Sequence, residues 1–187
     1  MKEKIFEKSI VLFGKNGFTE TSIQHIVEEL GVTKGTFYYY FTSKEELLME
    51  IHLRFINELL QSQKAIVEDE LKSAKEKLHG IVYMLLKNIE GQGQSAKVFF
   101  REMQNLNEEH LQDIFKKRDQ FRKQTQHVIE KGMEMGEFRQ DINAEIITLA
   151  ILGAANWGYH WYDPKGPLTE LQISDIYLDF IINGIQA

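Results

Sequence analysis

The sequence predicts an all-α protein of about nine helices, with a three-helix head at the N-terminus followed by a helical bundle. Apolar residues recur at spacings of three and four along most of the chain, as they do on one face of an amphipathic helix. No segment alternates polar and apolar residues as a strand would. Both prolines, Pro164 and Pro167, stand in one loop, so neither interrupts a predicted helix.

The first four helices are expected over residues 2–16, 22–30, 34–41 and 44–67, the last being long because residues 44–79 contain neither glycine nor proline. Further helices are expected over about 74–89, 96–106, 107–135, 143–161 and 168–185, with residues 91–95 as a connecting loop. We place a domain boundary near residue 50. It divides the chain into a head, residues 1–50, and a body, residues 51–187, that binds a ligand and dimerises.

Residues 22–44 carry the most informative pattern of the chain. A helical stripe ends at Gly31, where a left-handed C-cap is expected. Thr21 and Gln24 have the spacing of a capping box at the start of this helix, and Thr33 can cap the next one. Ser43 and Glu46 repeat the capping-box spacing before the long helix. Two short helices joined by a tight turn indicate a helix-turn-helix.

The second helix of this pair carries side chains suited to DNA. Gly35 costs a helix about 1 kcal/mol relative to alanine, but it allows another body to approach the backbone. The consecutive tyrosines 38–40 supply hydroxyl donors for phosphate groups. Lys44 stands in the first turn of a helix, where the dipole disfavours a cation unless an anion binds there too. An aromatic-rich structural turn with a stray lysine is the alternative interpretation.

These residues resemble the TetR family of bacterial transcriptional repressors. The family pattern T-x-x-x-I-A, A-G-V-S-x-G-T-L-Y-x-H-F and x-x-K-E-x-L corresponds here to residues 22–27, 30–41 and 44–47, and the resemblance covers roughly the first fifty residues. Val27 and Leu30 replace alanines that are usual in the family, and Tyr40 replaces a common histidine. The resemblance implies a repressor that binds double-stranded DNA at a near-palindromic site.

The DNA-binding residues expected on this basis lie between positions 21 and 44. Phosphate contacts are expected from Thr21, Ser22, Thr36, Tyr38, Tyr40 and Lys44. Base-edge contacts are expected from Lys34, Gly35 and Tyr39, and Thr33 begins the helix that presents them.

Composition excludes several other classes of protein. The net charge is −6, of which residues 1–44 contribute +1 and the remainder −7, so charge alone does not indicate a nucleic-acid binder. The absence of cysteine fits a reducing cytoplasm. The most apolar segment, residues 146–155, is far shorter than the ~20 residues that span a bilayer. We therefore expect a cytoplasmic protein that does not bind membranes.

An enzyme is not expected. The six histidines form no H-x-x-x-H pair and no set with zinc-ligand spacing, and no G-x-S-x-G motif is present. The sequence therefore predicts no catalytic site, no metal site and no cofactor.

The body carries a second, shorter resemblance. Residues 156–168 read N-W-x-x-H-W-Y-D-P-x-G-P-L, which looks like a segment of TetR-like regulators of fatty-acid and aromatic-acid catabolism whose ligand is an acyl-coenzyme A. The ligand-binding residues that we expect are Tyr83, Phe99, Phe100, Arg101, Met103, Arg118, Phe121, Arg122, Trp157, His160 and Trp161. The apolar members would hold an acyl tail, and the arginines would hold phosphates.

Alternatives to this ligand site remain open. The arginines can instead form ordinary salt bridges with acidic neighbours, and the aromatic cluster can belong to the core and a dimer interface. The protein can also be an efflux regulator that senses lipophilic drugs, or a DNA-binding module without a small ligand. Because the last two helices offer more apolar surface than one small body can bury, we expect a homodimer whose heads lie about one helical turn of DNA, ~34–36 Å, apart.

Overall fold

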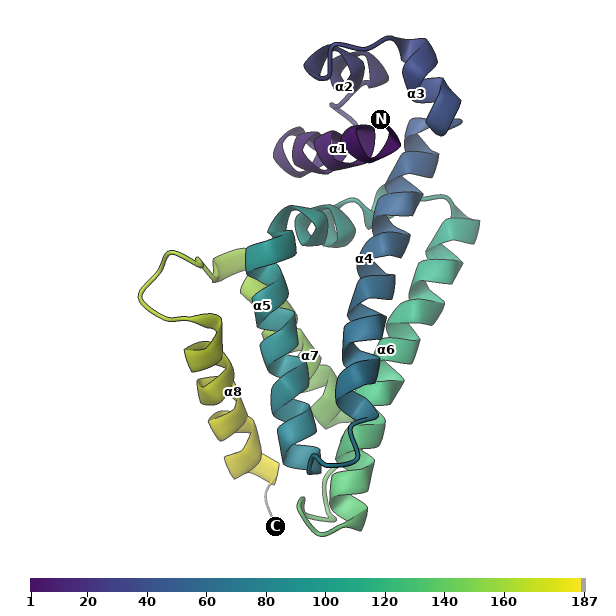
Figure 1. The fold of residues 1–187 in the computed structure, drawn as a ribbon. Helices are drawn as coiled ribbons and strands as arrows, with labels where there is room; N and C mark the ends of the chain where they lie inside the picture. The colour runs from purple at the N-terminus through teal and green to yellow at the C-terminus, as the bar shows by residue number, and fades with distance from the viewer. Residues whose placement is uncertain (186–187) are drawn as a thin grey trace. The chain divides into compact units, whose positions relative to one another are not determined.

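The structure, a computed structural model, describes residues 1–185. Those residues form eight α-helices and one turn of 3-10 helix, with no strand among them (Figure 1). The elements are α1 (Lys2–Asn16), α2 (Ile23–Glu29), α3 (Lys34–Tyr40), α4 (Lys44–Val67), α5 (Ala74–Arg101), η1 (Met103–Asn105), α6 (Glu108–Glu134), α7 (Ala144–Trp161) and α8 (Glu170–Ile185). The predicted all-α class and its N-terminal helix-turn-helix are confirmed.

The chain divides into two compact units. Unit 1 contains residues 1–57 and 92–116, and unit 2 contains residues 58–91 and 117–187. The helices α4, α5 and α6 therefore each contribute to both units. The domain boundary expected near residue 50 falls inside α4 and stays a prediction.

The head folds around the apolar face of α1. Phe13 is fully buried, and Phe18, just after the helix, packs edge-on against it with the ring centroids 5.2 Å apart. The chain can reverse between them because Gly17 has a φ of 94°, a backbone conformation that glycine adopts more easily than residues with a side chain. Phe37 of α3 and Phe41 just after it are also buried. These contacts fix α3 against the rest of the head, so its opposite face is presented to solvent.

The turn between α2 and α3 has the geometry that the sequence predicts. Gly31 has a φ of 65°, its amide donates to the carbonyl of Glu28, and the amide of Val32 donates to that of Val27. This pair of bonds is a Schellman motif. The hydroxyl of Thr33 then accepts from the amide of Thr36, 3.3 Å away, and starts α3 as expected.

The start of α2 differs from the prediction in one residue. Ser22 caps the helix by accepting a hydrogen bond from the amide of His25, 3.1 Å away. Thr21 is fully buried instead, and its hydroxyl donates to the carbonyl of Gly17 over 2.7 Å. The predicted Thr21–Gln24 capping box is therefore wrong, because the threonine faces the inside of the head. Gln24 pairs with Glu28 on the surface.

The loop predicted at residues 91–95 is also wrong. The helix α5 continues through them, with non-helical dihedral angles at Gln92 (φ −129°, ψ 22°) that mark a kink. Two glycines cost a helix only about 1 kcal/mol each, and the residues beyond them bury apolar side chains such as Val98 and Phe99 in unit 1. Burial therefore outweighs the local preference of the glycines for a loop. Beyond Arg101 the chain forms η1, not the helix predicted as far as residue 106.

Unit 2 is a bundle held together by an apolar core and a few buried polar contacts. The side chain of Gln63 on α4 is fully buried and donates to the carbonyl of Phe121 and the hydroxyl of Thr125, both on α6. The carboxylate of Glu137, between α6 and α7, accepts hydrogen bonds from the first two amides of α5, those of Ala74 and Lys75. These bonds satisfy backbone and side-chain groups that the core would otherwise leave without partners.

Candidate DNA interface and the predicted ligand residues

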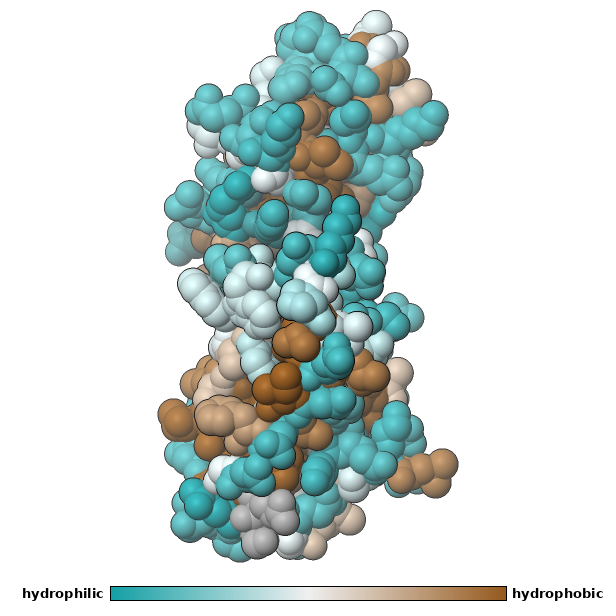
Figure 2. Space-filling view, turned by 90° about the vertical axis from the view of Figure 1, so that its left-hand side faces the viewer, coloured by the Kyte–Doolittle hydropathy of each residue, from teal (hydrophilic) through white to brown (hydrophobic). Residues whose placement is uncertain are grey.

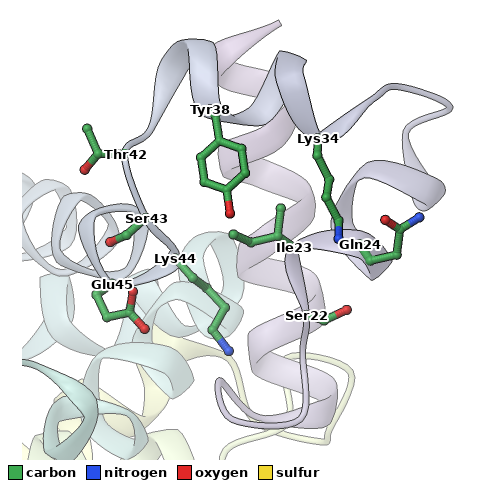
Figure 3. Close-up of a pocket in the computed structure, with 9 residues that line it drawn as sticks. All are labelled: Ser22, Ile23, Gln24, Lys34, Tyr38, Thr42, Ser43, Lys44 and Glu45. Carbon is green, nitrogen blue, oxygen red and sulfur yellow. The ribbon is translucent and has the colours of Figure 1, made fainter.

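A hollow of about 390 Å³ opens on the head between α2, α3 and the start of α4 (Figure 3). It is lined by Ser22, Ile23, Gln24, Lys34, Tyr38, Thr42, Ser43, Lys44 and Glu45. Five of these lining residues, at positions 23, 24, 42, 43 and 45, are absent from the predicted DNA-binding set. The sequence offered only one indication of these five residues, which is that they adjoin the two predicted helix starts.

Two helix starts meet at this hollow. Ser22 caps α2, and the hydroxyl of Ser43 accepts from the amide of Glu46 at the start of α4. The carboxylate of Glu46 turns back to the amide and hydroxyl of Thr42, so this capping box closes on Thr42. The amides of a first helical turn have no acceptor within their helix, and the dipole is positive there. The hollow therefore suits an anion such as a phosphate group.

The side chain of Lys44 lies at the edge of the hollow and is hydrogen-bonded to the main chain of the head. Its ammonium donates to the carbonyls of Phe18 and Thr21 over 2.8 and 2.9 Å, and it lies 4.2 Å from the centroid of the Phe18 ring. In Figure 3 the side chain extends toward the chain that leads into Ser22. Burial lowers the pKa of this lysine. The side chain thus ties the loop between α1 and α2 to the start of α4.

The exposed face of α3 carries the other predicted residues. Tyr38 and Tyr39 are 54% and 81% exposed, although aromatic side chains of this size are usually buried. The hydroxyl of Tyr38 points toward Ile23 across the hollow, and Lys34 extends beside Gln24 (Figure 3). This face thus presents a cation and two phenol groups to whatever binds there.

Gly35 lies on the same face without a packing reason to be glycine. A Cβ atom built there meets only the hydroxyl of Thr33, at an ordinary 3.6 Å. Thr36 and Tyr40 are half-buried, and Thr33 is exposed. The structure thus brings nine of the ten predicted DNA-binding residues to the surface or edge of the α2–α3–α4 region. Thr21 is the exception, since its side chain is enclosed.

The predicted ligand residues divide between the units. Phe99, Phe100, Arg101 and Met103 belong to unit 1, and the other seven belong to unit 2. Phe99 is buried against Phe55, with their ring centroids 4.8 Å apart. The guanidinium of Arg101 donates to main-chain carbonyls at the end of α1. Within unit 1, these two residues are thus already engaged in the fold.

The two arginines of unit 2 differ in their surroundings. Arg122 donates to Asp119 over 2.8 Å and to Glu145 over 3.2 Å, which matches the salt-bridge alternative. Arg118 is exposed as a whole residue, yet protein atoms around its guanidinium lower its pKa by desolvation. The guanidinium of Arg118, which is the group that an anion would contact, is therefore less hydrated than the exposure of the whole residue indicates.

The aromatic cluster on α7 is largely exposed. Trp157 and Trp161 are 62% and 47% exposed, and the ring of Trp157 stacks on His160 with the centroids 4.3 Å apart. Phe121 is buried, and Tyr83 is half-buried beneath Lys87. Large exposed apolar side chains continue along α7, the following loop and α8: Ile146, Leu149, Trp157, Trp161, Leu168, Leu171, Ile176 and Phe180. Figure 2 shows brown apolar surface on the face that α8 covers.

Within residues 1–185, no group of three histidine, aspartate or glutamate side chains is arranged to hold a metal ion. Of the helices described there, none has the length and apolar character needed to cross a membrane.

Comparison with known proteins assigns both parts of the chain. Residues 5–51 match the family "Bacterial regulatory proteins, tetR family", and residues 71–185 match "Tetracyclin repressor-like, C-terminal domain". The chain is 28% identical over 183 residues to the HTH-type transcriptional repressor KstR2 of Mycobacterium tuberculosis, covering 97% of this chain and 91% of that protein.

Solved structures agree with this assignment. The ketosteroid transcriptional regulator KstR2 of Mycobacterium tuberculosis superposes with a TM-score of 0.90 at 27% identity, covering 100% of this chain and 95% of that one. AibR in complex with isovaleryl coenzyme A and operator DNA superposes with a TM-score of 0.86 at 22% identity, covering 96% of each chain. At that identity AibR shows the fold alone.

The fold and the hollow on its head define a helix-turn-helix protein that binds DNA. The chain belongs to the TetR family of bacterial regulatory proteins and is a transcriptional repressor of that family. Its relatives are repressors and not enzymes. The sequence-based assignment to the TetR family is confirmed.

Proposed function

We propose that this repressor binds its operator as a homodimer, with the hollow of each head on the phosphate backbone and α3 in the major groove. The observation that carries the proposal is the meeting of the starts of α2 and α4 beside the exposed face of α3. Helix starts attract phosphates, and a recognition helix reads base edges. The two kinds of contact would therefore be made side by side.

The residues take separate roles in this proposal. The hydroxyls of Ser22, Thr36, Tyr38 and Tyr40 and the ammonium of Lys44 would contact phosphates, which set position without reading sequence. Lys34, Gly35 and Tyr39 would face base edges. Gly35 would act through its missing side chain, because the space above it is open. The buried hydroxyl of Thr21 leaves that residue a role in supporting the loop.

The dimer would form through α7 and α8. Isolated exposed apolar residues are normal on proteins, but here they recur along two consecutive helices. The small residues Gly153 and Ala154 are also exposed on α7, where they allow a neighbouring helix to approach. A two-fold interface of this kind would present two heads to a near-palindromic site.

The ligand in this proposal is an acyl-coenzyme A that releases the repressor from DNA. The complex of AibR with isovaleryl coenzyme A and operator DNA supports it by fold, and the ketosteroid regulator KstR2 supports an apolar ligand. The guanidinium of Arg118 would bind a phosphate of the coenzyme. Release would require the ligand to bind more tightly to the form that does not bind DNA. A lipophilic drug is the second candidate, because an apolar bundle accepts one without needing an arginine.

The test is a fluorescence anisotropy titration of the protein on a duplex that it selects from a random pool. Coenzyme A thioesters of increasing chain length are added, beside free coenzyme A, the free fatty acids and a lipophilic cationic dye. Chain-length-dependent release by thioesters alone, weakened in Arg118→Met but unchanged in Arg139→Met, is the expected result. Equal release by the free acids would remove the coenzyme from the proposal, and release by the dye alone would favour the drug-sensing alternative.

A further inference from the structure

Within unit 1, hydrogen bonds join the last turn of α5 to the last turn of α1, and we call this contact the grip. The guanidinium of Arg101 donates to the carbonyl of Phe13 and, over 3.3 Å, to that of Gly14. The carbonyl of Phe13 also accepts from the amide of Gly17, and both carbonyls lie at the negative end of the helix dipole. A planar guanidinium with several donors is suited to bind both of them at once.

A buried carboxylate orients this guanidinium. Glu102 is only 4% exposed and accepts hydrogen bonds from the Nε of Arg101 over 2.6 Å and from the amide of Asn105 over 2.9 Å. The side chain of Gln94, about two turns before Arg101 on the same face of α5, lies so close to Gly14 that a Cβ atom there would overlap its amide. Arg101 and Gln94 thus join the end of α5 to the end of α1, and Glu102 and Asn105 support Arg101 from η1 and the residue before it.

The gripping segment is separated from the rest of α5 by the kink. The backbone leaves helical geometry at Gln92, and unit 1 resumes at that same residue. Cβ atoms built on Gly91 and Gly93 would meet nothing within 4 Å, so packing does not demand glycine at either position. The two glycines instead lower the stability of the helix at this point, because the glycine backbone is conformationally free.

We propose that Arg101 is a positioning residue for DNA binding. By holding the end of α1, it fixes the loop from Gly17 to Thr21 and therefore the start of α2 at the proposed phosphate site. The kink between Gly91 and Gly93 allows the end of α5 to loosen this grip. The inference rests on the proposed DNA interface, and it assigns to Arg101 a role other than holding a ligand phosphate.

Arg101→Met tests the grip against Arg139→Met, which removes an exposed arginine of unit 2 that pairs with Asp141 at 3.2 Å. We expect DNA affinity to fall about tenfold in the first variant, with a partial recovery in Arg101→Lys and no change in the control. Because Arg101→Met also leaves the buried carboxylate of Glu102 without its cation, stability is compared in Arg101→Lys, which keeps the charge and whose thermal unfolding should shift little. A purely structural role would lower stability and affinity together.

Hydrogen exchange gives a readout that does not depend on DNA. In Arg101→Met the amides of residues 13–21 should exchange faster than in the wild type or in Arg139→Met. Unchanged exchange there, or wild-type DNA affinity, would overturn the positioning role. If the wild type itself selects no duplex from the random pool, the proposed interface fails, while the exchange experiment still decides whether Arg101 holds α1.

The kink is tested by replacing both Gly91 and Gly93 with alanine. The open space at both positions admits the methyl groups, so the variant should fold normally. We expect slower exchange of the amides of residues 92–101 and DNA affinity at least equal to that of the wild type, since the grip would open less often. Exchange rates identical to those of the wild type would show that the kink does not loosen the grip.

Discussion

The ammonium of Lys44 donates to the carbonyl oxygen of Phe18 over 2.8 Å and lies above the ring of the same residue. A lysine in the first turn of a helix is unfavourable by itself, and this arrangement offsets the cost by binding main-chain oxygens. An ammonium has three N–H donors, of which the carbonyls of Phe18 and Thr21 use two. In the proposed complex the third donor would bind a phosphate group at the hollow.

Lys44→Met should therefore weaken DNA binding in two ways, by releasing the loop and by removing a cation. We expect an affinity loss of about tenfold on every duplex sequence and a decrease of about 0.9 in the slope of log affinity against log salt concentration. Anisotropy at four or more salt concentrations measures both. Lys8→Met is the control, because that lysine pairs with Glu29 on the surface. A lower affinity with an unchanged slope would show that Lys44 holds the loop between α1 and α2 but contacts no phosphate.

Gly35→Ala should separate folding from DNA binding. The added methyl group meets no atom closer than 3.6 Å, and alanine favours a helix over glycine by up to about 1 kcal/mol, so stability should stay or rise. DNA affinity should fall at least tenfold, because the close approach of a DNA backbone or base would be blocked. Gly31→Ala is the matched contrast: its φ of 65° should make it lose stability. Unchanged affinity in Gly35→Ala would remove this residue from the interface.

The dimer should depend on Phe180. This side chain is 79% exposed on α8, and Phe180→Asp should place a charge in the proposed interface and yield monomers at micromolar concentration in sedimentation experiments. Leu71→Asp is the control, because Leu71 is 96% exposed but lies in the turn between α4 and α5. A Phe180→Asp protein with the doubled mass would show that the subunits meet elsewhere.

Acid should destabilise unit 1 through His52. This histidine is fully buried, and its Nδ1 donates to the carbonyl of Leu48 over 2.9 Å. Burial lowers its pKa, while hydrogen bonds to the main chain of Leu48 and Phe99 and the charge of Glu102 act in the opposite direction. The unfolded chain therefore binds a proton more readily than the folded one.

The stabilising contribution of neutral His52 is complete above its unfolded pKa of about 6.5 and is lost as the pH falls toward the folded value. The wild type should lose up to about 1.4 kcal/mol of unfolding free energy per pH unit more than His52→Gln does below pH 6.5. Urea unfolding at pH 7.5, 6.5 and 5.5 measures the difference. His127→Gln, which removes an exposed histidine, should behave as the wild type. If the unfolding free energy of all three proteins changed in parallel with pH, His52 would not be the source of the acid sensitivity.

Much of the fold could be predicted because the signals were local. The left-handed Gly31, the cap at Thr33 and the uninterrupted α4 all follow from residues within a few positions of one another. The kink at Gln92 could not be predicted from Gly91 and Gly93, because distant apolar contacts in unit 1 decide whether two glycines end a helix or bend it.

The residues of the candidate site were predictable in type but not in orientation. Thr21 and Ser22 are adjacent and chemically alike, and only the packing of the head determines which one caps α2 and which one turns inward. Arg101 illustrates the same limit. A cation among apolar residues suggested a bound phosphate, but the three-dimensional fold brings the end of α1 to it, some 87 positions earlier in the chain.

Both tryptophans of the chain, Trp157 and Trp161, lie on the exposed part of α7. Indole emission depends on contact with water, so the tryptophan fluorescence of this protein originates from the surface on which the proposed partner subunit would sit. Assembly can therefore be followed on the unlabelled chain by dilution, from the wavelength of its own emission. The head contains tyrosines but no tryptophan, so it would contribute nothing to the indole emission when only tryptophan is excited.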